Sequence, residues 1–213
     1  YGSYVGGSQA ESARDVGLDA AGNAYVSGAS RSPDFPVSDG SFGTAHAGGQ
    51  DAFLLKLDPA GTLAYAGLLG GGGDDWGLAV SVDAGGSATL AGSSTAFPLT
   101  GEASAAGGTG QGYDAFVARV DEFGSALVHA SALGGGEEDY AAAVAVDELG
   151  SVYVVGNSAR GTGGRALADA FLSKLVVGSP FLDLPVAYSN FSQAALGNVG
   201  DRGAGRVNSW FDH

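Results

Sequence analysis

A repeat of 64 residues constrains the fold of this sequence more than any other feature. Shifting the 213-residue chain by 64 positions aligns it with itself twice. In a chain of repeats, each unit forms one supersecondary element, and neighbouring units bury each other's hydrophobic faces. The aligned sets include Val5, Leu69 and Leu133; Val16, Val80 and Val144; Asp19, Asp83 and Asp147; Gly22, Gly86 and Gly150; and Gly28, Gly92 and Gly156.

A second recurring block shows that one loop of the unit varies in length. The string Asp-Ala-Phe begins at Asp51, Asp114 and Asp169, so its spacing is 63 residues and then 55. The variable loop is therefore expected over about 29–50 and 93–113, and in a shortened form over about 157–168.

Each unit is predicted to contain four short β-strands. Leu78 to Val82 alternates between large and small residues with the period of a strand, and Asp-Ala-Gly-Gly follows as a turn. Further strands are expected over 23–28 (151–156 in the third unit), 53–57 and 62–69. Apolar residues on both faces, mixed with Ala, Gly and Ser, indicate small sheets that are covered closely on both sides, as in a propeller. Helical patterning is weak, with one helical turn expected at Ser192–Leu196.

We therefore predict an all-β fold, a β-propeller of about three consecutive four-stranded blades. The repeats occupy 1–177, in units of approximately 1–66, 67–130 and 131–177, and 178–213 is a linker followed by a tail or a further segment. Tyr1 to Val5 matches the last strand of a unit, so it could complete the third blade, which lacks that strand. Because closed propellers have about four to eight blades, we expect an open arc of a larger propeller, or one that closes by self-assembly.

Composition excludes several classes of function. The formal net charge is −14, which repels the phosphates of nucleic acids and anionic membranes. The absence of cysteine excludes disulfides, thiolate catalysis and cysteine-based zinc sites. No apolar run approaches the roughly 18 residues of a membrane span, so membrane insertion is not expected.

The recurring aspartates are interpreted as structural. Asp19, Asp83 and Asp147 are expected to bond the backbone of their own turns. The Asp-Ala-Phe aspartates are each expected to begin a strand after a glycine-rich loop and to cap it or bond a turn.

The acidic glycine-rich turns are candidate cation sites. Glu11, Asp75 and Asp139 share one register, and Asp74 and Glu138 precede the last two. Clustered carboxylates on a flexible loop suit calcium, which makes Asp74, Asp75, Glu138 and Asp139 the candidate metal ligands. Neither an EF-hand spacing nor a calcium-binding nonapeptide is present. The alternative, which we favour, is a solvated acidic loop without a cofactor.

Two aromatic residues are the candidate ligand-binding residues. Trp76 and Tyr140 share a register directly after the acidic turns, where they could form a platform for a sugar or cover the rim of a neighbouring blade. No catalytic residues are predicted, since His46, His129 and His213 are scattered and form no Ser-His-Asp grouping.

The combined motif resembles a known family. Leu-Gly-Gly, then Val-Asp-x-x-Gly-Asn-x-Tyr-Val-x-Gly, a Phe-Pro loop and Asp-Ala-Phe-x-x-Lys-Leu-Asp-x-x-Gly resemble the bacterial SBBP β-propeller repeat, a relative of NHL-type propellers. The likeness runs from Tyr1 to about Leu175. The third unit departs from it, because it lacks the Phe-Pro element found at Phe35-Pro36 and Phe97-Pro98 and also lacks the closing Asp-x-x-Gly strand.

The resemblance implies a secreted or cell-surface bacterial scaffold, and it implies no particular ligand. We expect a non-enzymatic repeat scaffold or binding module that recognises a protein or glycan partner through its variable loops. The alternative is a propeller that accompanies the catalytic domain of a larger secreted hydrolase, with that domain following the C-terminus.

Overall fold

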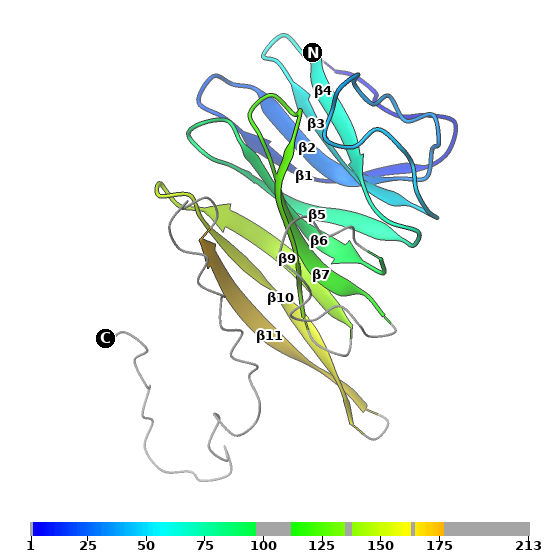
Figure 1. Ribbon diagram of the computed structural model, residues 1–213, viewed down its shortest axis with the longest axis vertical. Coiled ribbons are helices and arrows are strands. Elements are labelled where there is room, and N and C mark those ends of the chain that lie inside the picture. The colour runs from blue at the N-terminus through cyan, green and yellow to red at the C-terminus, as the bar shows by residue number, and fades with distance from the viewer. Residues whose placement is uncertain (1, 97–111, 135–137, 163–164, 177–213) are drawn as a thin grey trace.

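Three antiparallel β-sheets are stacked face to face in the computed structural model, which describes residues 2–96, 112–134, 138–162 and 165–176 (Figure 1). The described residues contain eleven strands and no helix, which confirms the all-β prediction. Sheet 1 has the order β1-β2-β3-β4, sheet 2 β5-β6-β7-β8 and sheet 3 β11-β10-β9. The strands are β1 (Glu11–Leu18), β2 (Ala24–Ser30), β3 (Asp51–Leu57), β4 (Leu63–Leu69), β5 (Asp75–Val82), β6 (Ala88–Ser94), β7 (Asp114–Val120), β8 (Leu127–Leu133), β9 (Asp139–Val146), β10 (Ser151–Thr162) and β11 (Arg165–Val176).

The predicted four-strand unit is confirmed in sheets 1 and 2. Sheet 3 has three strands among the described residues, and no sheet of the described part closes on itself. The expected helical turn at Ser192–Leu196, the Phe97-Pro98 element and the segment 178–213 lie outside the described residues.

The turn between the first two strands of each unit is held by its aspartate, as predicted. Oδ1 of Asp19 accepts hydrogen bonds from the backbone N–H groups of Ala21 (3.0 Å) and Asn23 (2.9 Å). Gly22 has a φ of 83°, which glycine adopts without steric cost. Asp83 and Asp147 make the same pair of bonds in their own turns, so the interpretation as turn aspartates is confirmed at all three positions.

A glycine and a phenylalanine face each other across two strands in every sheet. Gly28 lies directly opposite Phe53, and a Cβ on Gly28 would approach the phenylalanine ring to 2.6 Å. Gly92 pairs in the same way with Phe116, and Gly156 with Phe171. The ring therefore occupies the space that the glycine leaves open, which explains why both residues recur with the repeat.

The variable loop folds differently in the first and third units. In the first unit the segment 31–50 crosses the outer face of sheet 1, where Phe35 and Val37 pack with Phe53 and Leu55. In the third unit the prediction of a loop over about 157–168 is wrong. β10 and β11 continue through that segment, and Asn157 pairs with Ala170. With too few residues to cross a sheet face, the shortened segment pairs with itself and extends the hairpin. Asp169 consequently lies within β11 and does not begin a strand, unlike Asp51 and Asp114.

The N-terminal segment does not complete the third sheet, which contradicts our expectation. Residues 2–10 form no strand, and Val5 packs against the outer face of sheet 1 instead. The N–H and Oγ of Ser8 both donate to Oδ1 of Asp34 at 2.8 Å, which ties the segment to the variable loop. Sheet 1 lies at the opposite end of the stack from sheet 3 (Figure 1).

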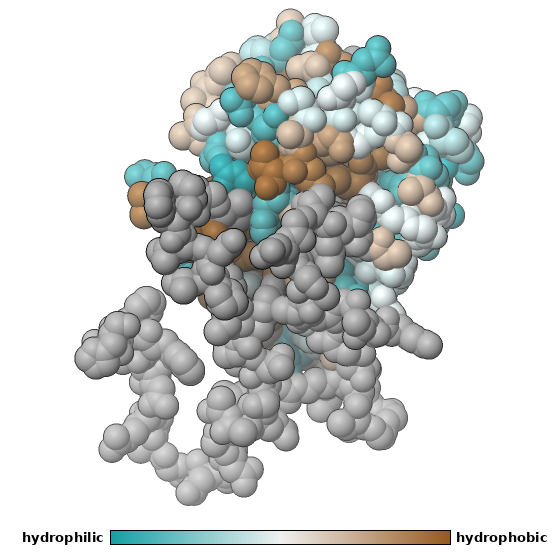
Figure 2. Space-filling view, in the orientation of Figure 1, coloured by the Kyte–Doolittle hydropathy of each residue, from teal (hydrophilic) through white to brown (hydrophobic). Residues whose placement is uncertain are grey.

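Each junction between sheets has its own hydrophobic core. Tyr25, Leu54 and Tyr65 of sheet 1 pack against Val80 and Val120 of sheet 2. Between sheets 2 and 3 the buried residues are Ala91, Ala115, Val117 and Leu133 on one side and Ala141, Val152, Val154 and Leu175 on the other. Hydrophobic residues also reach the surface in the middle of the face shown in Figure 2.

Candidate functional site

A row of acidic and hydroxyl side chains crosses each sheet at the start of the sheet's first strand. The members of a row lie directly opposite one another on three adjacent strands. The rows are Glu11, Ser30 and Asp51; Asp75, Ser94 and Asp114; and Asp139, Ser158 and Asp169. Each row thus places a hydroxyl between two carboxyl groups.

The serines of the first two rows donate to the acid of the first strand. Oε1 of Glu11 accepts hydrogen bonds from Oγ of Ser30 (2.9 Å) and from Oγ of Ser32. Asp75 accepts from Oγ of Ser94 at Oδ1 and from the backbone N–H of Gly71 (2.8 Å) at Oδ2. These bonds fix the carboxylates at the point where each unit begins its first strand.

Two of the carboxyl groups meet at the junction of sheets 1 and 2. Asp51 and Asp75 are both fully buried. A Cβ on Gly70 would overlap Oδ1 of Asp51 and would lie 2.6 Å from Oδ2 of Asp75. Gly70 therefore lets the chain that leaves β4 pass between the two carboxyl groups.

Burial raises the pKa of both carboxyl groups in this pair. For Asp51 a hydrogen bond from the backbone N–H of Ala47 (2.8 Å) opposes the effect, as does His46, whose Nε2 lies 3.6 Å from Oδ2. For Asp75 the bonds from Ser94 and Gly71 lower the pKa, and the charge of Asp51 raises it. Burial therefore disfavours the charged form of both carboxyl groups at this junction.

The second junction repeats the pair one unit later. Burial and the charge of Asp139 raise the pKa of Asp114 to about 6. Asp139 is fully buried, and a Cβ on Gly134 would overlap its carboxylate, just as Gly70 meets Asp75. Asp114 and Asp139 stand 63 and 64 residues after Asp51 and Asp75, so the pairing belongs to the repeat.

The structure divides the four candidate calcium ligands between two junctions, and the interpretation as a solvated loop is wrong for Asp75 and Asp139, which are fully buried. Asp75 lies near Asp51, and Asp139 lies near Asp114, whereas Asp74 is half-buried and Glu138 is exposed. Within the described ranges no group of three or more His, Asp or Glu residues gathers as a metal centre. Calcium binding stays a prediction. The buried pairs could not be found from sequence alone, because their partners meet only through the stacking of neighbouring sheets.

The candidate aromatic residues each contact the preceding unit. The guanidinium carbon of Arg14, on β1, lies 4.9 Å from the centre of the Trp76 ring. The Tyr140 ring lies 5.5 Å from that of Tyr113, and its hydroxyl donates to Glu138 at 3.1 Å. These contacts are those of residues that cover a neighbouring sheet. A sugar platform at these positions stays a prediction.

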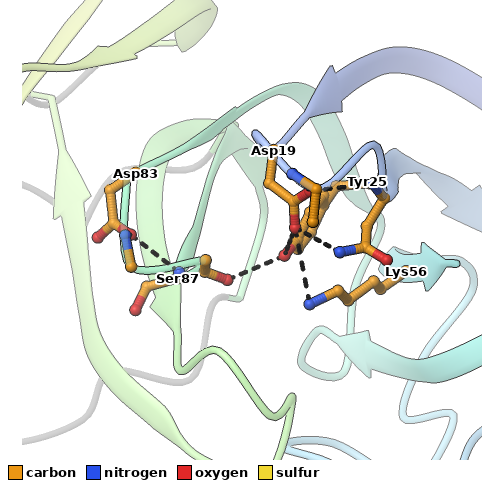
Figure 3. A network of polar contacts seen from close by, with 9 residues as sticks. Asp19, Tyr25, Lys56, Asp83 and Ser87 are labelled. Carbon is orange, nitrogen blue, oxygen red and sulfur yellow. Dashed lines mark hydrogen bonds and ion pairs between the residues drawn. The ribbon is translucent and has the colours of Figure 1, made fainter. Parts of the chain in front are cut away.

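A polar network joins the turns of sheets 1 and 2 (Figure 3). The Tyr25 hydroxyl lies 3.1 Å from both Oδ2 of Asp19 and the carbonyl oxygen of Gly86. Its single hydrogen can be donated to either acceptor. Lys56 lies 4.9 Å from the centre of the Tyr25 ring and 4.0 Å from Asp19. The network therefore links the turn of one unit to the turn of the next.

The second junction makes the same link with other residues. Arg119, which stands where sheet 1 has Lys56, pairs with Asp83 and reaches the carbonyl oxygen of Gly150 at 3.5 Å. Thr89 stands where sheet 1 has Tyr25. The carbonyl oxygen of the following turn is therefore contacted at both junctions.

No protein-family model matches this chain, and no curated protein matches it. The described residues contain no helix that is long and apolar enough to cross a membrane.

Proposed function

We propose that this chain is a non-enzymatic repeat scaffold or binding module, built as an arc of β-propeller blades in a secreted or cell-surface bacterial protein. Its partner would be a protein or a glycan, recognised through the loops between strands. The net charge of −14 makes nucleic acid an unsuitable partner. The resemblance to the SBBP repeat supports the bacterial and extracellular assignment.

One observation carries the scaffold proposal: the recurring polar residues are engaged in building units and joining them. Asp19, Asp83 and Asp147 bond their own turns. Tyr25 and Arg119 each reach the turn of the next unit. Such roles are required in every blade, which explains why the turn aspartates recur with the repeat.

Solution scattering tests the arc. We expect an elongated stack of three sheets, and a scattering profile of a compact closed monomer would contradict the proposal. Contrast between the two shapes is large, because in an open stack the first and third sheets stay at opposite ends (Figure 1).

Glycan arrays and pull-downs with defined surface proteins test the binding role. Trp76→Ala and Tyr140→Ala are expected to weaken binding, since both lie beside the acidic turns. Tyr4→Ala is the matched control, because Tyr4 is a fully exposed aromatic residue that lies outside the strands. Loss of thermal stability in the first two variants without any change in binding would assign the aromatics a packing role alone.

A further inference from the structure

The outer face of sheet 3 exposes residues that are buried at the two internal junctions. Ser27 and Leu54 form a cross-strand pair in sheet 1, and Ala91 and Val117 form the equivalent pair in sheet 2. All four are fully buried. The third equivalent pair is Val155 and Leu172, which face each other across β10 and β11 and are 41% and 62% exposed. Sheet 3 therefore presents a junction face without a covering sheet among the described residues.

At the opposite end of the stack, β1 exposes its part of the complementary face. Val80 of sheet 2 packs against Tyr25 and Leu54 of sheet 1 and is 6% exposed. Its equivalent in sheet 1, Val16, is 59% exposed, and Leu18, two residues later, is 68% exposed. β1 thus exposes residues whose equivalents in sheet 2 pack against sheet 1.

Sheet 3 also has the polar side chains that join two sheets at an internal junction. The Tyr153 hydroxyl lies 3.2 Å from Oδ2 of Asp147, and Lys174 lies 4.9 Å from the centre of the Tyr153 ring. This arrangement repeats Asp19, Tyr25 and Lys56 of sheet 1, whose tyrosine also reaches the Gly86 carbonyl oxygen of sheet 2 (Figure 3). At the free end of sheet 1, the residue equivalent to Gly86 is Gly22.

We propose that sheet 3 of one molecule docks head to tail on β1 of a second copy, with β1 in the place that β5 and β9 take at the internal junctions. The inference rests on the proposed scaffold function and names its partner. Contact is made with β1 and its turn, because Phe35 and Val37 already cover Phe53 and Leu55 of β3. Two different surfaces meet in such an interface, so it forms a ring if the rotation closes and a filament if it does not.

Sedimentation of the full chain over a range of concentrations gives the first test. We expect the wild-type mass to increase with concentration. Leu172→Asp and Val16→Asp are each expected to lower the association constant at least about 100-fold, because each buries a charge without a partner. Val128→Asp is the matched control, since Val128 is 54% exposed on β8 and belongs to neither end face. It should associate like the wild type.

Mixing the two disrupted variants gives the decisive test. Leu172→Asp keeps an intact sheet 1 face, and Val16→Asp keeps an intact sheet 3 face. Only head-to-tail docking predicts that the mixture forms a 1:1 complex that cannot grow, although each variant alone is monomeric. Both substitutions lie at exposed positions, and thermal melting checks that each variant folds.

A wild-type chain that stays monomeric at about 100 µM would overturn the inference, and so would association of the wild type without association of the mixed variants. In either case an elongated monomer in solution scattering would leave the proposed scaffold standing. A compact closed monomer would refute both.

Discussion

Replacing Asp114 by asparagine should stabilise the protein at neutral pH. The substitution keeps the shape of the side chain and removes one of the two charges at the junction of sheets 2 and 3. The pKa of Asp114 is raised from 3.8 to about 6 by burial and by Asp139. Each unit of pKa corresponds to about 1.4 kcal/mol, which sets an upper bound of about 3 kcal/mol at pH 7.5. Because the side chain is only partly buried, solvent screening reduces this to about 1–2 kcal/mol.

The sign of the pH dependence follows from the direction of the shift. A carboxyl group with a raised folded-state pKa binds its proton more tightly in the folded protein. The free energy of unfolding therefore falls as pH rises from about 3.8 to about 6, and stays low above that range. The gain from Asp114→Asn should be present at pH 7.5 and absent at pH 3.5, where Asp114 is protonated in the folded state.

Urea denaturation at the two pH values measures the effect, with chelator present so that no metal ion offsets the charge. For a chain of this length, 1–2 kcal/mol corresponds to a rise of about 2–8 °C in Tm. Asp39→Asn is the control, because it removes an exposed charge and should change stability by less than about 0.5 kcal/mol. A destabilised variant at pH 7.5, or an equal gain at pH 3.5, would refute the reasoning.

The turn aspartates act in the opposite direction at lower pH. The hydrogen bond from the Asn23 side chain lowers the pKa of Asp19, and that from the Ser151 backbone lowers the pKa of Asp147. Their contribution to stability is present above about 3.8 and is lost as pH falls through the lowered pKa. Together with Asp114, they place the highest stability in mildly acidic solution.

Three further predictions concern packing and charge. Gly70→Ala adds a methyl group between two buried carboxyl groups and should lower the free energy of unfolding by about 1–3 kcal/mol. Gly72→Ala is the control and should not lower it, because a Cβ at Gly72 would have no atom within 4 Å. Equal losses in the two variants would contradict this prediction. Phe116→Ala removes a fully buried ring and should lower the free energy of unfolding, measured by chemical denaturation, by about 3–5 kcal/mol. A loss below about 1 kcal/mol would show that the Phe116 ring does not support the core. Arg119→Met breaks the partly buried ion pair with Asp83 and should cost about 1 kcal/mol, less in about 1 M salt; a salt-independent loss would point to packing instead.

The local elements of the fold could be predicted because their causes lie within a few residues. The turn at Asp19 needs only an aspartate followed by a glycine three residues later, and both recur with the repeat. Four strands per unit followed from alternation and from the positions of such turns. The prediction of a loop in the third unit failed because the segment is short. Instead of forming a loop, the segment pairs with itself between Asn157 and Ala170.

The carboxyl pairs could not be predicted, because they depend on contacts between units. Asp51 lies on the third strand of sheet 1, and Asp75 lies on the first strand of sheet 2. Their separation of 24 residues in sequence says nothing of their distance until the sheets are stacked. The acidic register itself was visible, but sequence spacing associated Asp75 with Asp74, while the fold places it against Asp51.

The two junctions show that the repeat preserves a contact more strictly than it preserves a residue. In the register of Tyr25 and Tyr153 the second unit has Thr89, whose side chain is too short to reach the next turn. In that unit Arg119 replaces lysine, and its longer side chain reaches the carbonyl oxygen of Gly150. The mismatch in the alignment is therefore compensated on the neighbouring strand β7, where Arg119 lies directly opposite Thr89. Sheet 3 has the tyrosine and lysine of sheet 1, so its own junction should follow the arrangement of Figure 3.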